Sequence, residues 1–119
     1  MIIVDVKDCP IIESKHPLVD KTAGKLHKQV LIMPEDTGGQ GVVMTKFTMG
    51  GKLSFHTHSG EQILFFTKGK GMVATRDKEY IVTTGTTVYI PAGEIHSHGA
   101  APGCNCTHFT VFRGDSKAA

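Results

Sequence analysis

Apolar and polar residues alternate along much of the chain with the two-residue period of β-strands, and glycine or proline turns separate the alternating segments. Between residues 42 and 49, for example, every second side chain from Val43 to Met49 belongs to one face. No segment keeps a helical period over any length. The pattern predicts strands at residues 1–6, 28–33, 42–49, 63–66, 72–75, 79–83, 86–90, 95–99 and 107–112. Many short strands with glycine turns are typical of an all-β protein with a small jelly-roll barrel.

The segment Ile63–Phe66 is apolar at consecutive positions, so both of its faces need cover. One face would line the barrel interior, and a second sheet or a second subunit would cover the other. We therefore expect a homodimer. Lys68–Gly71 predicts a hairpin turn, residues 72–75 and 79–83 are expected to pair across Arg76–Lys78, and Gly114–Ala119 is expected to be a frayed tail.

Composition limits the classes of protein that need considering. A chain of 119 residues has room for one domain. The net charge is +2 and the lysines are scattered, so no basic stripe indicates a nucleic-acid partner. No apolar run reaches the length of a membrane span, and the opening Met1–Asp5 resembles a first strand more than a signal peptide. Three cysteines then indicate reduced thiols and a cytoplasmic location, with the close pair Cys104 and Cys106 expected to be plain loop residues.

Candidate chemistry begins with two histidines one residue apart, His56 and His58. On a strand, side chains at this spacing leave the same face, and two imidazoles on one face form half of a metal site. Gln62 has the same parity and would supply a third donor if the chain stays extended past Gly60, whereas Glu61 would point away and is the alternative ligand. Such a pair alone also fits two half-buried polar residues at a strand end.

A second segment carries a further histidine. It begins at Gly85, and a turn at Pro91-Ala-Gly93 ends its strand just before His96. The two segments together resemble the two sequence motifs of the cupin superfamily. The matching residues are Gly50, His56, His58, Gln62 and Gly69 in the first motif, and Gly85, Pro91, Gly93 and His96 in the second. Two residues depart from the family pattern: Gln62 stands where glutamate is most frequent, and Ala100 stands in place of an asparagine.

The resemblance implies a single cupin domain over residues 1–119, with a motif core at about 50–100, N-terminal strands within 1–33 and a last strand at 107–112. It also implies one divalent transition metal per chain, manganese or iron first, with nickel, cobalt or zinc as alternatives. The implied ligands are His56, His58, Gln62 and His96. The segment from His96 to His108 is similar to small single-domain cupins, some of which bind manganese through three histidines and a glutamine and act as hydroxynitrile lyases.

Two more histidines are candidates for the chemistry itself. His98 shares a strand face with His96, and His108 lies at an inward position of the last strand. A histidine near a divalent cation stays neutral and can act as a base. Alternatively, each bonds a backbone carbonyl or a ligand histidine and only positions it. The expected pocket wall contains Leu64 and Phe66, with Met44 or Phe47, which implies a small, weakly charged substrate.

Three functions fit these residues. The first is a metal-dependent lyase of cyanohydrin type in which His108 or His98 moves the proton. The second is an iron or manganese dioxygenase. The third is a module without catalytic activity that binds a metal and a small ligand, since a fold does not determine a function. No segment for DNA binding accompanies the motifs, so a sensor would need a partner protein.

Overall fold

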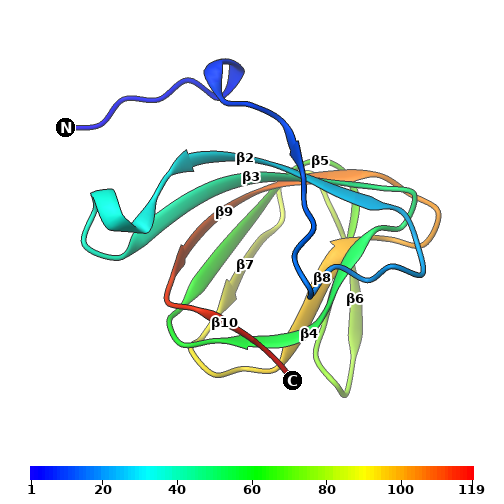
Figure 1. The fold of residues 1–119 in the computed structure, drawn as a ribbon. Helices are drawn as coiled ribbons and strands as arrows, with labels where there is room; N and C mark the ends of the chain where they lie inside the picture. The colour runs from blue at the N-terminus through cyan, green and yellow to red at the C-terminus, as the bar shows by residue number, and fades with distance from the viewer.

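The computed structural model describes all residues from Met1 to Ala119, and the fold it shows is nearly all-β (Figure 1). Two short 3-10 helices are present, η1 (Val6–Asp8) and η2 (Pro34–Asp36). The strands are β1 (Ile12–Glu13), β2 (Lys25–Ile32), β3 (Gln40–Thr48), β4 (Lys52–His58), β5 (Gln62–Ala74), β6 (Glu79–Thr83), β7 (Thr87–Ile90), β8 (His96–Ala100), β9 (Cys106–Arg113) and β10 (Ser116–Ala118).

The strands form two antiparallel sheets that share β5. In one sheet the order is β1-β2-β3-β9-β5-β7, and in the other it is β10-β4-β8-β5-β6. The first half of β5 pairs with β7 and β9, and its second half pairs with β6 and β8. The two sheets therefore curl around one interior as a jelly roll, with β4 and β8 facing β3 and β9 (Figure 1). The all-β jelly-roll prediction is confirmed.

The interior is apolar at one end and polar at the other. Phe47, Leu64 and Phe66 are fully buried, and they pack into one cluster with residues from both sheets. The other members of this cluster are Leu26, Val73, Ile90, Ala100 and Cys106. Five histidines, His56, His58, His96, His98 and His108, are also buried on inward-facing strand positions. The apolar cluster supplies the packing that stabilises the domain, so the polar end can hold a site at some cost in stability.

Three predictions about local structure are wrong. Residues 1–6 do not form a strand: Met1–Asp5 is an exposed arm that leads into η1. Lys68–Gly71 is not a hairpin turn, because a bulge after Phe66 and the left-handed backbone of Gly69 bend β5 so that it continues into the second sheet. Gly114–Ala119 is not a frayed tail, since Ser116–Ala118 pairs with β4.

The remaining strand predictions agree with the structure to within a few residues. The expected pairing of residues 72–75 with 79–83 is confirmed by the register of β5 and β6. Each 3-10 helix has three residues, and no helix in the structure is long and apolar enough to cross a membrane.

Candidate metal centre

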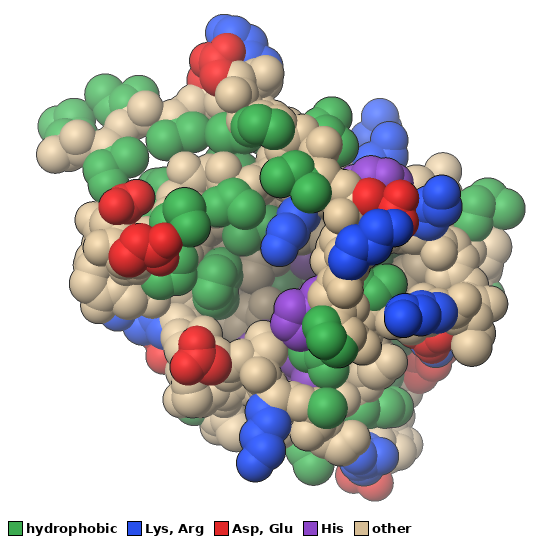
Figure 2. All heavy atoms as spheres, viewed as in Figure 1, with side chains coloured by type: hydrophobic (Ala, Val, Ile, Leu, Met, Phe, Trp, Pro, Cys, Tyr) green, Lys and Arg blue, Asp and Glu red, His purple; other side chains and the backbone are tan.

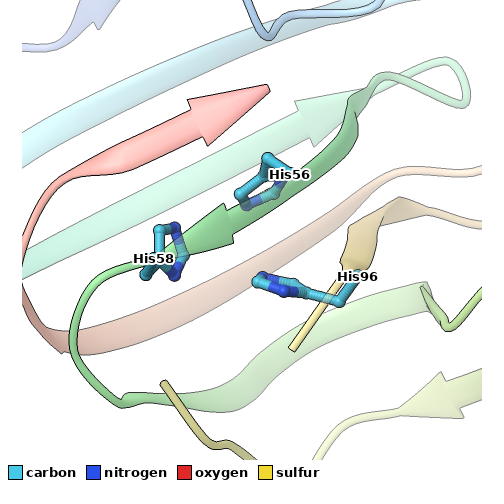
Figure 3. A group of neighbouring side chains, drawn as sticks. All are labelled: His56, His58 and His96. Atoms are coloured by element: carbon cyan, nitrogen blue, oxygen red, sulfur yellow. The ribbon is translucent and has the colours of Figure 1, made fainter. Parts of the chain in front are cut away.

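Three histidines from two neighbouring strands meet at the polar end of the interior. His56 and His58 lie on β4, and His96 lies at the start of β8, which pairs with β4 (Figure 3). Their rings face a common point, and one nitrogen of each lies within 4.8 Å of the others. The ring centroids of His56 and His96 are 4.3 Å apart. The spacing of His56 and His58 on one strand predicts that their rings share a face. The turn at Pro91–Gly93 then brings His96 to the same point from the neighbouring strand.

Backbone carbonyls fix which nitrogen of each ring carries the proton. His56 Nδ1 lies 2.6 Å from the carbonyl oxygen of Ser54, and His96 Nδ1 lies 2.9 Å from that of Glu94. A carbonyl oxygen only accepts, so Nδ1 carries the hydrogen in both rings and Nε2 presents a lone pair. A metal-ligating histidine commonly has this arrangement. His56 Nε2 is buried without a hydrogen-bond partner, and so is His58 Nδ1.

Gln62 completes the group from the first residue of β5. Its side chain is buried, and its Oε1 lies 3.3 Å from His96 Nε2. Since His96 donates from Nδ1 to Glu94, its Nε2 and the amide oxygen of Gln62 are two acceptors facing one another. Two lone pairs at this distance repel, and a cation between them removes the repulsion. Glu61 points away and lies 3.6 Å from Arg113 in a half-exposed ion pair, so the structure places Gln62 and not Glu61 at the centre.

Burial keeps these imidazoles neutral. Burial, opposed by the bond to Ser54 and helped by neighbouring His96, lowers the pKa of His56 to about 4. Burial also lowers the pKa of His58 to about 4, with the positive forms of His56 and His96 adding to the effect. The pKa of His96 is lowered as well, mainly by burial. Neutral imidazole is the form that binds metals, so the ligand set is ready for a cation near pH 7.

The donor set fits a divalent transition metal. Three imidazole nitrogens and one amide oxygen, with no thiolate, suit manganese, iron, cobalt, nickel or zinc. None of the four donors is an anion, so a bound cation would retain its positive charge. The orphaned nitrogens of His56 and His58 and the facing acceptors of His96 and Gln62 are the observations that support this fit.

His98 and His108 form a second, separate pair deeper in the barrel. His98 Nδ1 lies 3.0 Å from His108 Nε2, and His108 Nδ1 lies 3.0 Å from Thr110 Oγ1. Phe47 and Phe66 pack against the His108 ring, with centroids 5.1 Å and 5.2 Å away. His98 Nε2 is buried with no partner. The pair is therefore a chain of hydrogen bonds with one free end, at His98.

Desolvation decides the charge of this pair too. Burial lowers the pKa of His108 to about 4, and it lowers the pKa of His98 well below the usual range, helped by the neighbouring histidines. Both rings are neutral near pH 7, so each can accept a proton from a nearby donor.

A pocket of about 180 Å³ joins the two groups of histidines. This is smaller than the roughly 300–1,000 Å³ of sites for drug-sized ligands, so the pocket takes a small molecule. Its apolar wall differs from the expected one: Leu64, Phe66 and Phe47 pack beneath it in the core, and Met44 faces the outside of the sheet. The apolar residues that line it are Leu18, Leu26, Val43, Leu53 and Phe112.

Two lining residues with ionisable side chains, Lys28 and His16, were not predicted from the sequence. Lys28 lies on β2, two residues after the inward-facing Leu26. Because inward and outward positions alternate along a strand, this spacing indicates that Lys28 also faces inward. His16, expected to be a surface residue, is exposed yet lines the pocket mouth. It directly precedes Pro17 in a segment with no periodic pattern, so its position at the pocket could not be predicted from the sequence.

Known proteins support the assignment of the fold. The chain is similar to a cupin-like protein from Thermotoga maritima at 27% identity, with a TM-score of 0.82 over 90% of this chain and 83% of that one. It is similar to the polyketide cyclase RemF from Streptomyces resistomycificus at 20% identity and a TM-score of 0.82, covering 100% and 85% of the two chains. It is also similar to a predicted oxalate decarboxylase from Thermotoga maritima at 18% identity and a TM-score of 0.80, covering 96% and 100%.

No curated protein matches the chain at a significant level. The family model of the cupin domain matches residues 43–111, which include all four residues of the candidate centre as well as His98 and His108. The match covers more than half of the sequence, and both the jelly-roll topology and the three-histidine cluster agree with it. The chain belongs to the cupin domain family.

Proposed function

We propose that the protein is a metal-dependent enzyme that acts on a small organic substrate, and that its reaction is a lyase reaction of cyanohydrin type. One observation carries this proposal. Four uncharged donors face a common point beside a small pocket, and the same pocket borders a buried histidine pair that the donor set does not use. A cation site and a separate proton acceptor in one pocket are the two parts that such a reaction needs.

His56, His58, Gln62 and His96 would hold a divalent cation, with manganese or iron as the first candidates, and it supplies Lewis acidity to a substrate oxygen when bound. The bonds from Nδ1 to the carbonyls of Ser54 and Glu94 hold the His56 and His96 rings in the required tautomer. The apolar wall from Leu18 and Leu53 limits the water that reaches the substrate.

The proton is taken by the pair of His98 and His108. When His98 Nε2 accepts the hydroxyl proton of a cyanohydrin, Nδ1–H donates to His108 Nε2 and His108 Nδ1–H donates to Thr110. The substrate C–O bond becomes a carbonyl, the bond to the cyano carbon breaks, and its electron pair leaves with cyanide. The cyanide then takes the proton back from His98, which restores the neutral pair.

Two alternatives use the same site. A dioxygenase reaction needs oxygen beside the substrate at the cation, and a binding module needs only the pocket and the four donors. Measuring turnover of the metal-loaded protein with and without oxygen separates all three. The lyase needs no oxygen, the dioxygenase stops without it, and a binding module shows no turnover in either condition.

The deciding experiment joins metal analysis to turnover. The protein is loaded with manganese, iron, nickel or zinc, its metal content is measured by elemental analysis, and cyanohydrin cleavage is then assayed without oxygen. We expect about one ion per chain, and we expect His56→Ala to weaken metal binding by at least about 10-fold because one of four donors is gone. His27→Ala, on the outward side of β2, is the matched control. A wild-type chain that binds none of the four metals contradicts the proposal.

We also propose that the protein is a cytoplasmic homodimer with no nucleic-acid or membrane partner. The absence of a disulfide among Cys9, Cys104 and Cys106 supports a reducing compartment.

An apolar outer surface on the sheet that contains β5 and β7 supports the dimer. It includes Ile63, Phe65 and Tyr89, which are 39%, 41% and 63% exposed.

A further inference from the structure

The pocket contains no acidic residue. Its sixteen lining residues include one lysine and five histidines besides hydroxyl, amide and apolar side chains, but neither aspartate nor glutamate. Two acidic side chains outside the lining, Glu13 and Glu61, are paired with basic residues. Glu13 pairs with Lys15 at 2.8 Å and with Lys25 at 3.9 Å, and Glu61 pairs with Arg113. A divalent cation held by four neutral donors would add two further positive charges to a pocket that offers nothing to balance them.

Lys28 is the positive side chain of this pocket. It lies in a row of inward positions that crosses three strands, beside Thr45 of β3, which in turn lies beside His108 of β9. Strands are about 4.8 Å apart, so the backbone of Lys28 lies about 10 Å from that of His108, within reach of a flexible lysine side chain. Lys28 is half-buried, and no hydrogen bond or ion pair engages its amine. An anion in the pocket would give this amine the partner that the protein itself does not supply.

The other residue at the mouth also presents a donor. His16 Nδ1 accepts the backbone N–H of Leu18 at 3.1 Å. The neutral ring then carries its hydrogen on Nε2, which is free to donate. Figure 2 shows histidine side chains and a lysine or arginine side chain at the edge of the hollow on this face of the molecule. No carboxylate in the pocket lining pairs with these donors and positive charges.

We propose that the substrate is a small organic acid whose carboxylate is bound by Lys28, with His16 as a second donor, while its reacting oxygen faces the candidate metal centre. Only the position of the reacting oxygen at the metal centre rests on the proposed function; the binding of the carboxylate by Lys28 does not. The pocket volume of about 180 Å³ limits the acid to a few carbon atoms. The substrate is therefore anionic, in contrast to the weakly charged substrate that the sequence implied.

A bound carboxylate accounts for the inward position of Lys28, which a lysine that only extends into solvent would not need. A lysine at a barrel mouth can extend its amine into water. Lys46 on β3 does so from the outward side of the same sheet, where it is exposed. Lys28 instead points to the same side as Thr45, His108 and Leu26, which are all buried. An anion in the pocket pairs with Lys28 and offsets the charge of the cation at the same time.

The test compares lactate with lactamide, which has the same shape but no charge. The zinc-loaded protein is titrated with each compound by calorimetry, after its metal content has been measured. We expect wild-type protein to bind lactate at least about 10-fold more tightly than lactamide. Lys28→Met should abolish this preference without loss of zinc, and Lys28→Arg should restore part of it. Lys46→Met, a lysine of the neighbouring strand on the other face, should keep the full preference.

The outcomes separate this inference from the proposed enzyme. Wild-type protein that binds lactate no better than lactamide overturns the inference, as does a preference that survives in Lys28→Met, because direct binding to zinc would then explain it. The same titrations are made on metal-free protein, where we expect weaker binding that still depends on Lys28. If the protein takes up no metal but keeps a preference for lactate that depends on Lys28, the metal-enzyme proposal fails and the anion site stands.

Discussion

The residues of the candidate centre differ in what holds each side chain in place. His56 and His96 are each fixed by a hydrogen bond to a carbonyl two residues earlier on their own chain segment. Gln62 has no such bond, and its amide oxygen lies 3.3 Å from His96 Nε2. Its amide oxygen is also a weaker donor than the carboxylate that is most frequent at this family position. Gln62 is therefore the position at which one substitution can change the charge of the site without disturbing the three rings.

Replacing Gln62 by glutamate tests that reasoning. A carboxylate binds a divalent cation more strongly than an amide and neutralises part of its charge. Gln62→Glu should keep or tighten metal binding while lowering turnover by about 10-fold or more, since the Lewis acidity falls. Gln40→Glu, at an exposed end of β3, is the control and should change neither. Unchanged affinity and unchanged turnover in Gln62→Glu would show that this side chain is not a ligand.

Removing His108 should separate proton transfer from metal binding. His108→Ala leaves all four donors in place but removes the partner of His98 Nδ1, so we expect near-normal metal content and a turnover lower by about 10²- to 10⁴-fold. His108→Gln keeps most of the side-chain volume against Phe47 and Phe66 and guards against a folding defect. Circular dichroism and elemental analysis check the two requirements. Loss of the metal in both variants, or full turnover in either, contradicts the division between ligands and base.

The pH profile gives a further check on the same pair. Burial lowers the pKa of His98, the proton acceptor of the pair, well below the ordinary value of 6.5. A base works in its neutral form, so activity falls only when pH drops through the lowered pKa. Wild-type turnover should therefore stay level as pH falls from neutral through 6.5, where an ordinary histidine base would lose activity. The folded state binds protons less readily than the unfolded chain at these histidines, so metal-free protein should lose stability as pH falls from about 6.5 towards 4.

At the scale of whole elements, β4 depends on its neighbours to keep His56 and His58 in position. One edge pairs with β8 and the other with β10, the last strand of the chain. The β10 register places Ser116 opposite His58 and Ala118 opposite His56. The bonds are between backbones, with Ser59 N–H donating to Asp115 and Ala119 N–H donating to Phe55. The last strand therefore holds the backbone under two of the candidate ligands.

Deleting residues 115–119 should loosen the centre without touching a ligand. β4 would become an edge strand with unpaired backbone groups. We expect a lower melting temperature and a metal affinity weaker by about 10-fold, the lower end of the effect of losing a group that positions a ligand. Lys117→Ala is the control, because it keeps the backbone pairing and replaces only an exposed side chain. Unchanged affinity in the truncated protein would show that β8 alone positions β4.

The same elements show why some of the fold could be predicted from the sequence and some could not. His56, His58 and Gln62 share one face because strand parity is local, and local spacing can be read from the chain. Ser116–Ala118 has no apolar alternation, so its pairing depends on β4 being near, which is tertiary information. Lys68–Gly71 has the glycines of a turn, but the bulge there bends one strand between two sheets. The inward position of Lys28 follows from that of Leu26, two residues earlier on the same strand. Leu26 lay outside the predicted strand, which began at residue 28, whereas β2 begins at Lys25.

At the scale of the whole molecule, one outer surface is unusually apolar. Val42, Val111, Ile63 and Tyr89 form a row across β3, β9, β5 and β7, at positions whose neighbours along each strand point inward. Phe65 and Phe109 lie opposite one another in the adjacent row. The arm Met1–Val4 is apolar as well, and Ile3 is 87% exposed. Figure 1 shows the arm running above β2, and Ile3 and Val4 line a surface hollow together with Met44 and Phe109. Side chains of this kind on a single surface are typical of an interface.

A charge placed in this surface should separate the two subunits of the proposed dimer. We expect wild-type protein to have twice the 12.8 kDa mass of the chain in light scattering after gel filtration, and Phe65→Lys to have the mass of one chain. The reason is the cost of burying an unpaired lysine in an apolar contact. Tyr80→Lys, which changes an exposed aromatic residue on β6, should remain dimeric.

Removing Met1–Val4 tests whether the arm takes part, since a dimer that uses it would dissociate at higher protein concentration than wild type. A monomeric wild-type protein would show that there is no dimer, and a dimeric Phe65→Lys variant would show that the interface lies elsewhere. In either case Ile63, Phe65 and Tyr89 would belong to a free surface.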